Sequence, residues 1–323
     1  MFTGRLIYNP AAGQVATHKM IRRAAQQLHK HGWSIEVTES RSGEHTTELS
    51  RAAAGSNIDA VFVAGGDGSV RAAVEGLVGS PTAMGALPAG TMNVWAQELG
   101  LPRLTRLRRD ALARSAKALA NGRIQSVDVG ICGQRTFLLW AGVGLDGVIV
   151  DQMEGARQGR RHFSLPKYLA AAAWKVSSWK GQELSLDVDG TQINGHYLFA
   201  VMSNTRSYAG GLAEISPQAC LDDGEMDLWL FSGDSIQKAL QHAWRLLRGE
   251  HVRSPEVEFV KFRQLSIESD SPLVTQLDGD PFTYGTRLDV AVRSQALQAL
   301  MPNDAPEELF SRPGTQIGGA NNT

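Results

Sequence analysis

The chain has 323 residues, a formal net charge of −1 and two cysteines, Cys132 and Cys220. A nearly neutral chain lacks the basic field of a nucleic-acid-binding protein, and two distant cysteines indicate neither a disulfide framework nor a metal site. The longest apolar runs contain charged residues and are too short to span a bilayer, and a first strand near residue 5 argues against a cleaved secretory signal. We therefore expect a cytoplasmic protein of about two domains that does not bind nucleic acid.

The N-terminal third alternates between strand and helix patterns. Strand patterns cover residues 6–9, 34–38, 59–64 and 84–87, and helical patterns lie between them. Such alternation is typical of a parallel sheet with helices on both faces, whose ligands bind beyond the carboxyl ends of the strands. We predict a doubly wound α/β nucleotide-binding domain over residues 1–126.

The pattern changes from about residue 127. Short alternating segments lie at 184–188, 197–203, 225–231, 256–262 and 265–269, with helical spacing at 165–179 and 235–247. They predict a mostly antiparallel β-sandwich domain over residues 127–287, and a late strand near 288–300 that returns to complete the first domain. The tail 303–323 is rich in Gly, Pro, Asn and Thr, and its composition predicts disorder.

The most informative segment is Gly65-Gly66-Asp67-Gly68-Ser69, directly after an apolar strand pattern. Glycines let a phosphate approach the backbone, and a helix N-terminus attracts anions. Asp67 is repelled by a phosphate unless a cation lies between them, which favours a role in holding Mg²⁺. The alternative is that Asp67 only caps the next helix. Thr91 and Asn93 are placed to cap a further helix that ends near Leu99.

Six motifs in order resemble the diacylglycerol kinase catalytic domain superfamily, and within it the bacterial lipid kinases related to diacylglycerol, phosphatidylglycerol and sphingosine kinases. The resemblance covers nearly the whole chain to about residue 300. The motifs are Asn9-Pro10-Ala11-Ala12-Gly13, the segment Gly65–Ser69, Leu87-Pro88-Ala89-Gly90-Thr91-Met92-Asn93, Gly142-Val143-Gly144-Leu145-Asp146, Ser216-Pro217-Gln218-Ala219 with Asp222-Asp223-Gly224, and Leu277-Asp278-Gly279-Asp280.

The resemblance implies an NAD kinase/diacylglycerol kinase-like fold that uses ATP and Mg²⁺, with Asp67 organising the catalytic ion. Small and hydroxyl-bearing residues at strand ends leave room for phosphates and donate hydrogen bonds to them. The implied nucleotide-binding residues are Asn9, Pro10, Ala11, Ala12, Gly13, Thr38, Gly65, Gly66, Asp67, Gly68, Ser69, Val70, Arg71, Gly90, Thr91 and Asn93.

The family's base for the attacking hydroxyl is the acidic residue that ends an Asp-Gly-Glu motif, and Asp280 occupies that position here. Aspartate is one methylene shorter than glutamate, which weakens a positioned proton transfer unless the strand has moved. A shared role for Asp278 is the other possibility. The alternative is that this segment is only a hairpin turn. Asp146 follows a Gly-Val-Gly loop and is a candidate site carboxylate or a turn cap. Val94 replaces an Asp that many members carry.

Resemblance also implies a structural Mg²⁺ site, at which Asp223 acts with main-chain oxygens of Cys220 and Glu225. Hard oxygen ligands suit Mg²⁺, so the cysteine contributes its carbonyl rather than its sulfur. The alternative is an Asp-Asp-Gly turn between strands.

The expected partners are a lipid substrate and, transiently, the membrane surface. Two basic groups are candidates for that contact, Arg103 with Arg106, Arg108 and Arg109, and Arg157, Arg160 and Arg161 with Lys167. A plain solvated face is the alternative for the first group. The apolar residues that follow the second group are expected to line a pocket or to belong to a core. A homodimer stays an open alternative.

The motifs favour an ATP- and Mg²⁺-dependent lipid kinase that phosphorylates diacylglycerol, phosphatidylglycerol or a similar lipid hydroxyl. NAD kinase is the closest rival because it shares the GGDG loop, but it lacks the Asn-Pro-x-x-Gly opening; phosphofructokinase opens with a different loop. A degenerate member that binds nucleotide or lipid without turnover is the third alternative.

Overall fold

The computed structural model describes residues 1–10, 17–105, 108–151, 179–283 and 285–317. The chain forms two compact units, one made of Met1–Val129, Cys220–Gly224 and Arg293–Thr323, the other of Gly130–Ala219 and Glu225–Val292. Strands of both units belong to one 16-stranded sheet, and each unit is described by itself. No helix in the described part of the chain has the length and apolarity needed to cross a bilayer.

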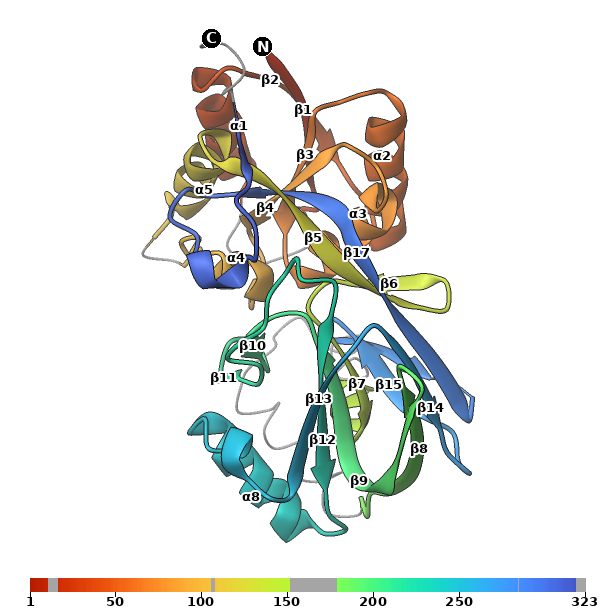
Figure 1. Ribbon diagram of the computed structural model, residues 1–323. Coiled ribbons are helices and arrows are strands. Elements are labelled where there is room, and N and C mark those ends of the chain that lie inside the picture. Colours follow the sequence, from red (N-terminus) through yellow and green to blue (C-terminus); the bar gives the residue numbers. More distant parts are fainter. Residues whose placement is uncertain (11–16, 106–107, 152–178, 284, 318–323) are drawn as a thin grey trace. The chain divides into compact units, whose positions relative to one another are not determined.

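The first unit is built on a parallel sheet with the strand order β2-β1-β3-β4-β17 (Figure 1). Its strands are β1 (Phe2–Tyr8), β2 (Trp33–Glu39), β3 (Ala60–Gly65), β4 (Ala83–Pro88) and the late strand β17 (Arg287–Met301), which joins β4 in parallel at Ala299. Every residue of β3 and β4 is buried, as expected for central strands covered by helices on both faces.

Helices pack in pairs against this sheet, α1 with α5 and α2 with α3 (Figure 1). Their bounds, with those of the short α4, are α1 (His18–Lys30), α2 (Gly43–Gly55), α3 (Asp67–Leu77), α4 (Val94–Glu98) and α5 (Ala111–Ala120). The apolar residues of α1 recur every three to four positions and are buried. Thr17 caps this helix by accepting a hydrogen bond from the Met20 N–H.

The second unit is mostly antiparallel (Figure 1). Its elements, including β5, which begins in the first unit, are β5 (Arg123–Cys132), β6 (Arg135–Phe137), β7 (Trp140–Gly144), β8 (Gln182–Val188), β9 (Thr191–Ser203), β10 (Ser207–Tyr208), β11 (Ala213–Glu214), β12 (Met226–Ser232), α8 (Ile236–Leu247), η1 (His251–Arg253), β13 (Val257–Phe262), β14 (Gln264–Glu268), β15 (Val274–Leu277) and β16 (Asp280–Thr283). Asp189 and Gly190 have φ values of 50° and 88° and form the expected tight turn between β8 and β9.

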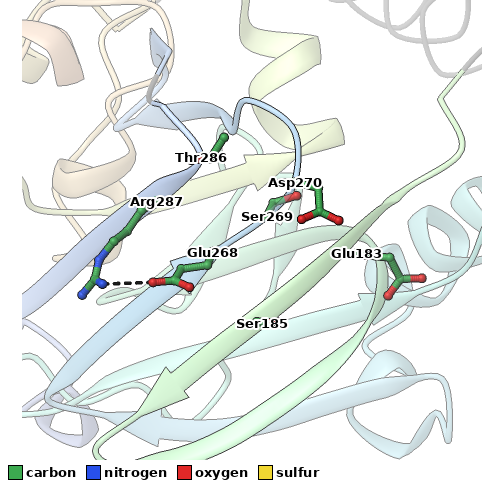
Figure 2. A pocket seen from close by; sticks show the side chains of 7 residues that line it. All are labelled: Glu183, Ser185, Glu268, Ser269, Asp270, Thr286 and Arg287. Atoms are coloured by element: carbon green, nitrogen blue, oxygen red, sulfur yellow. Dashed lines mark hydrogen bonds and ion pairs between the residues drawn. The ribbon is translucent and has the colours of Figure 1, made fainter.

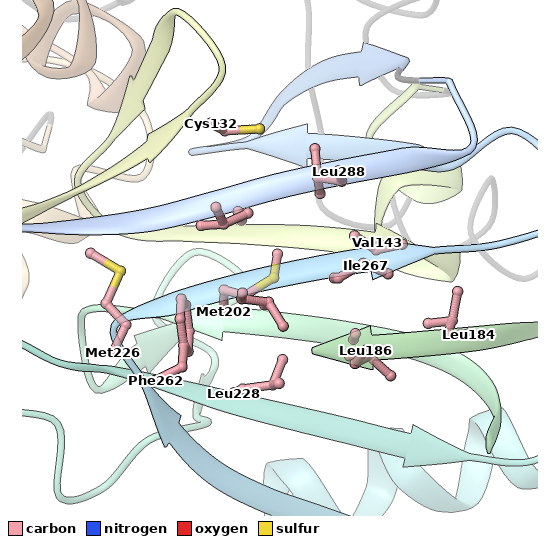
Figure 3. Packing of buried hydrophobic residues seen from close by; sticks show 14 of the residues in the cluster. Cys132, Val143, Leu184, Leu186, Met202, Met226, Leu228, Phe262, Ile267 and Leu288 are labelled. Carbon is pink, nitrogen blue, oxygen red and sulfur yellow. The ribbon is translucent and has the colours of Figure 1, made fainter. Parts of the chain in front are cut away.

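One apolar cluster forms the core of the second unit (Figure 3). Alternate residues of neighbouring strands meet there, including Leu184 and Leu186 of β8, Met202 of β9, Leu228 of β12 and Ile267 of β14. The period-2 pattern that predicted these strands thus also gives their buried face. The parallel α/β unit and the mostly antiparallel unit confirm the predicted fold class.

The C-terminal segment differs from the prediction of disorder. Residues 303–317 include η2 (Glu307–Leu309) and β18 (Thr315–Gln316), which pairs with β5 at Ile124. Leu309 is fully buried, and its carbonyl accepts a 2.8 Å hydrogen bond from the Leu221 N–H. For these residues the prediction is wrong, because average composition does not register individual buried apolar residues such as Ala305 and Leu309.

Candidate functional site

The carboxyl ends of the parallel strands of the first unit form one edge, and a cavity of about 270 Å³ lies there. Its walls come from the ends of β1 and β3 and the start of α1, with Tyr8, Asn9, Pro10, Thr17, His18, Ile21 and Ala64 as lining residues. Asn9 and Pro10 are thus at a hollow on the edge where the sequence predicts nucleotide binding. Ala11, Ala12 and Gly13 lie outside the described residues.

Two glycine turns, one after β3 and one after β4, touch each other at this edge. Gly90 N–H and Ala89 N–H both donate to the Gly65 carbonyl, at 3.1 and 3.0 Å. A Cβ on Gly90 would stand 2.3 Å from the Gly66 Cα, far closer than two carbons approach. Glycine is therefore required by close packing of the two turns, and the bare backbone that results suits approach by a phosphate.

Asp67 is the first residue of α3, and the residue before it, Gly66, is the cap. Its carboxylate accepts a hydrogen bond from the Trp95 N–H at the start of α4, at 3.3 Å. Burial raises the pKa of Asp67, and backbone N–H groups of Val94, Trp95, Asp67 itself and Asn93 oppose that shift. The carboxylate therefore joins the two turns rather than capping its own helix.

Asn93 is the N-cap residue of α4, a position that fits its predicted capping role, but its side chain does not bond to that helix. It lies in the left-handed region with φ 54°. Its side chain instead makes two 2.8 Å hydrogen bonds to Gly90, accepting from the N–H and donating to the carbonyl. Asn93 thereby holds the second glycine turn closed. Next to it Thr91 is exposed, and its carbonyl accepts a 2.9 Å hydrogen bond from Arg103.

The remaining predicted nucleotide-binding residues differ in whether they present a polar atom at this edge. Thr38, near the end of β2, has a buried hydroxyl that finds no hydrogen-bond partner among the described residues. The Ser69 hydroxyl lies over Gly65, where a Cβ would stand 2.4 Å from it. Val70 is buried in the core, Gly68 is exposed, and Arg71 pairs with Glu75 at 3.8 Å. Thr38 is one of several residues with a buried polar side-chain atom that lacks a partner among the described residues, and its place near the end of β2 fits a contact with a ligand atom.

In the second unit, Asp278 and Gly279 form the two-residue turn between β15 and β16. Their φ values of 50° and 84° are those of a type I′ hairpin turn. The Asp278 carboxylate accepts hydrogen bonds from three successive backbone N–H groups, those of Leu138 and Leu139 at 2.8 Å and Trp140 at 3.1 Å. Asp278 therefore has an anchoring role, and it fixes the hairpin that carries Asp280 as the first residue of β16.

Asp146 is buried in the same unit. Its two carboxylate oxygens accept hydrogen bonds from the Tyr208 hydroxyl at 2.5 Å and the Gln276 amide at 2.7 Å. Burial raises its pKa, and these two donors oppose the shift. A Cβ on Gly142 would stand 1.7 Å from Asp146 Oδ2, so the absence of a side chain at Gly142 makes room for the carboxylate.

The predicted metal residues lie on one loop, which Asp128 of β5 supports. The Asp128 carboxylate accepts from the Gly224 N–H at 2.7 Å and the Gln295 N–H at 2.6 Å, and burial and the neighbouring Asp223 raise its pKa. The Glu225 side chain pairs with Arg263 at 3.1 Å. No group of three metal-ligating side chains occurs in the ranges described above, so an ion held by Asp223 would need the main-chain oxygens of Cys220 and Glu225.

A second hollow, of about 430 Å³, lies in the second unit and contains none of the predicted site residues (Figure 2). Its lining residues are Glu183, Ser185, Glu268, Ser269, Asp270, Thr286 and Arg287. Arg287 pairs with Glu268 at 2.9 Å and with Asp289 at 3.0 Å, which leaves its charge compensated.

Sequence reasoning missed three residues that hold site carboxylates or their loops: Asp128, Tyr208 and Gln276. Asp128 had a signal, since a charged residue in the apolar run Val127–Val129 is costly unless its hydrogen bonds serve a purpose. Tyr208 lies in a polar segment without a recognisable pattern, and Gln276 is a single amide within a strand. Arg106, Arg157, Arg160, Arg161 and Lys167 lie outside the described residues.

Comparisons with known proteins agree with this architecture. A family model for the diacylglycerol kinase catalytic domain matches residues 3–132, and a model for the YegS C-terminal NAD kinase beta sandwich-like domain matches residues 141–301. A crystal structure of a diacylglycerol kinase from Bacillus anthracis strain Sterne has a TM-score of 0.72 at 19% identity and covers 94% of this chain and 98% of that chain.

Curated relatives match over almost their full length. The diacylglycerol kinase of Mycobacterium tuberculosis (strain CDC 1551 / Oshkosh) is 32% identical over 311 residues, covering 91% of this chain and 93% of the relative. That of Bacillus subtilis (strain 168) is 25% identical over 315 residues, covering 96% and 99%. The chain therefore belongs to the diacylglycerol kinase family and is a lipid kinase.

Proposed function

We propose that this lipid kinase transfers the γ-phosphoryl group of ATP, with Mg²⁺, to the hydroxyl of diacylglycerol. Relatives matched over nine-tenths of the chain carry the name diacylglycerol kinase. Phosphatidylglycerol or a similar lipid alcohol is the acceptor to be compared with it. The proposal also includes the predicted cytoplasmic location with transient attachment to the membrane, since the acceptor resides in a bilayer.

The single observation that carries the proposal is the edge of the first unit. Two glycine turns in contact offer bare backbone, Thr38 offers a buried hydroxyl without a partner among the described residues, and Asp67 adds a carboxylate oxygen. Backbone N–H groups and hydroxyls favour phosphate oxygens, and a carboxylate beside them favours a cation. This donor set fits a nucleotide polyphosphate with its Mg²⁺.

The residues then have distinct proposed tasks. Asp67 would hold the ion, which when bound neutralises phosphate oxygens during transfer. Asp280 would accept the proton of the acceptor hydroxyl, and Asp278 would position it by fixing the hairpin through three N–H groups. Asp146 would order Tyr208 and Gln276. Asp223, with main-chain oxygens of Cys220 and Glu225, would hold a structural Mg²⁺.

The test is transfer of label from γ-labelled ATP to lipid, with diacylglycerol or phosphatidylglycerol supplied separately and Mg²⁺ present or chelated. We expect labelled product in the organic phase with diacylglycerol, lost in Asp67→Ala and Asp280→Ala. Asp110→Asn, which removes an exposed carboxylate that makes no capping bond, is the matched control. Label on NAD or a sugar in a parallel aqueous assay, with none on lipid, would overturn the proposal.

A further inference from the structure

Helix α8 has two apolar faces, and only one of them is buried. Ala239, His242 and Leu246 are the buried residues. His242 donates to the Ser232 carbonyl at 2.8 Å, and its ring meets those of Phe199 and Phe231 edge-on, at 6.4 and 5.3 Å between centroids. This face anchors α8 to β9 and β12.

The opposite face carries an apolar stripe, Leu240, Trp244 and Leu247, at positions i, i+4 and i+7. These side chains are 60%, 62% and 59% exposed. Residues at this spacing lie one above the other on a helix, so the three form one continuous surface. The helical spacing of the whole segment indicates a helix, but packing against the sandwich explains only the other face.

The charges around the stripe favour an anionic surface. Residues 236–256 contain four basic residues and two acidic residues, although the whole chain has a net charge of −1. Lys238 and Arg245 share Glu256. The guanidinium of Arg248 pairs with Glu250 at 2.6 Å and lies 5.8 Å from the centroid of the Trp244 ring, and Arg253 is exposed on η1, so cations outnumber carboxylates around the stripe.

We propose that the stripe inserts into the surface of a bilayer that contains anionic lipid, and thereby brings this lipid kinase to its substrate. Trp and Leu with flanking Arg are the composition of helices that lie in a membrane interface. A second copy of the chain fits less well. Even at ~250 Å² each, three side chains exposed to about 60% offer on the order of 450 Å², short of the roughly 800 Å² per partner of a typical interface.

This inference rests on the proposed function only in that both need a lipid substrate, and its test does not depend on turnover. The full chain is sedimented with vesicles of phosphatidylcholine and with vesicles that also contain phosphatidylglycerol. Binding to the anionic vesicles should fall at least tenfold in the variant Leu240→Gln/Trp244→Gln/Leu247→Gln. Gln241→Ala, an exposed residue of the same helix beside the stripe, should bind as the unchanged chain does.

Two further variants separate insertion from loss of fold and from charge alone. Trp244→Ala should weaken binding while Trp244→Phe restores most of it, with unchanged Tm in both. Arg248→Gln should weaken binding to the anionic vesicles about fivefold and have little effect on neutral ones. Equal sedimentation of the triple variant and the unchanged chain would overturn the proposal. So would a triple variant that binds normally but loses a dimer seen by light scattering.

Activity distinguishes this inference from the proposed function. On diacylglycerol dispersed in detergent the triple variant should retain kcat, whereas on vesicles its KM should rise. If the unchanged chain phosphorylates no lipid but the stripe still governs vesicle binding, the proposed acceptor is wrong and the membrane surface stands. If turnover on vesicles is normal in the triple variant, the stripe is not the membrane surface.

Discussion

The backbone N–H of Trp95 donates to the carboxylate of Asp67, and so links the turn after β4 to the first residue of α3. Because burial raises the pKa of Asp67, the ionised form is held at a cost in the folded protein at neutral pH. A cation bound as proposed would remove this cost, because a nearby positive charge favours the ionised form.

The first prediction is that Asp67→Asn is inactive but more stable. Because the pKa of Asp67 is higher in the folded than in the unfolded chain, the free energy of unfolding of the unchanged chain should fall as the pH rises through the folded pKa. The neutral amide removes this term, and we expect a Tm increase of about 2 °C at neutral pH without Mg²⁺, with label transfer reduced to background. A lower Tm would mean that the N–H groups outweigh burial.

The second prediction concerns contact between the glycine turns. Gly90→Ala places a Cβ 2.3 Å from the Gly66 Cα, a backbone atom that cannot rotate away. The two turns must separate, and we expect nucleotide affinity, measured by calorimetry, to fall at least tenfold. Gly55→Ala in α2 meets nothing within 4 Å and is the matched control, which should bind normally. Normal nucleotide binding by Gly90→Ala would show that the contact between the two glycine turns is not needed for binding.

The third prediction tests the buried hydroxyl of Thr38. Because its oxygen has no partner in the described part of the protein, Thr38→Val removes a desolvated polar atom at nearly constant volume. We expect equal or greater stability and weaker ATP binding, by about fivefold to tenfold. A loss of stability with unchanged binding would show that the hydroxyl serves the fold.

These residues also show how far sequence alone reaches. Gly65, Gly90 and Asp67 could be predicted to act together because parallel strands end at one edge. Asn93 was predicted to cap a helix and is the N-cap residue of α4, but its left-handed backbone turns the amide back to Gly90. A local rule recognises the residue type at a helix start and does not fix its φ.

Contacts between distant residues could not be predicted. Asp146 meets Tyr208 and Gln276, which are 62 and 130 positions away, and neither pairing leaves a pattern in a single sequence. The tail 303–317 was misjudged for a related reason, since Ala305 and Leu309 are buried although the segment as a whole is polar. Composition describes an average, whereas burial is decided residue by residue.

The fourth prediction separates the two carboxylates of the hairpin. Asp278→Asn replaces one acceptor oxygen by a donor amide facing backbone N–H groups, and should cost about 3 kcal/mol of unfolding free energy. Asp280→Asn should leave chemical denaturation unchanged and reduce kcat at least a hundredfold. The reverse result, a stable inactive Asp278→Asn and an active Asp280→Asn, would assign the proton transfer to Asp278.

The fifth prediction concerns His242 of α8 and His251 of η1, both fully buried. Burial lowers the pKa of each, and each Nε2 donates to a carbonyl, of Ser232 and Ile215 respectively, at 2.8 Å. Neither Nδ1 has a partner among the described residues, so protonation would place an N–H in an apolar site. The folded state therefore favours the neutral rings.

A lowered folded pKa means that only the unfolded chain takes up these protons below about pH 6.5. Stability is complete above that pH and falls as the pH drops, by up to about 1.4 kcal/mol per pH unit for each histidine. His242→Gln keeps a donor for the Ser232 carbonyl and cannot titrate, so its unfolding free energy between pH 6.5 and 5 should fall with about half the slope. Parallel curves would show that His242 is protonated in the folded protein and that the rings packed on it tolerate the charge.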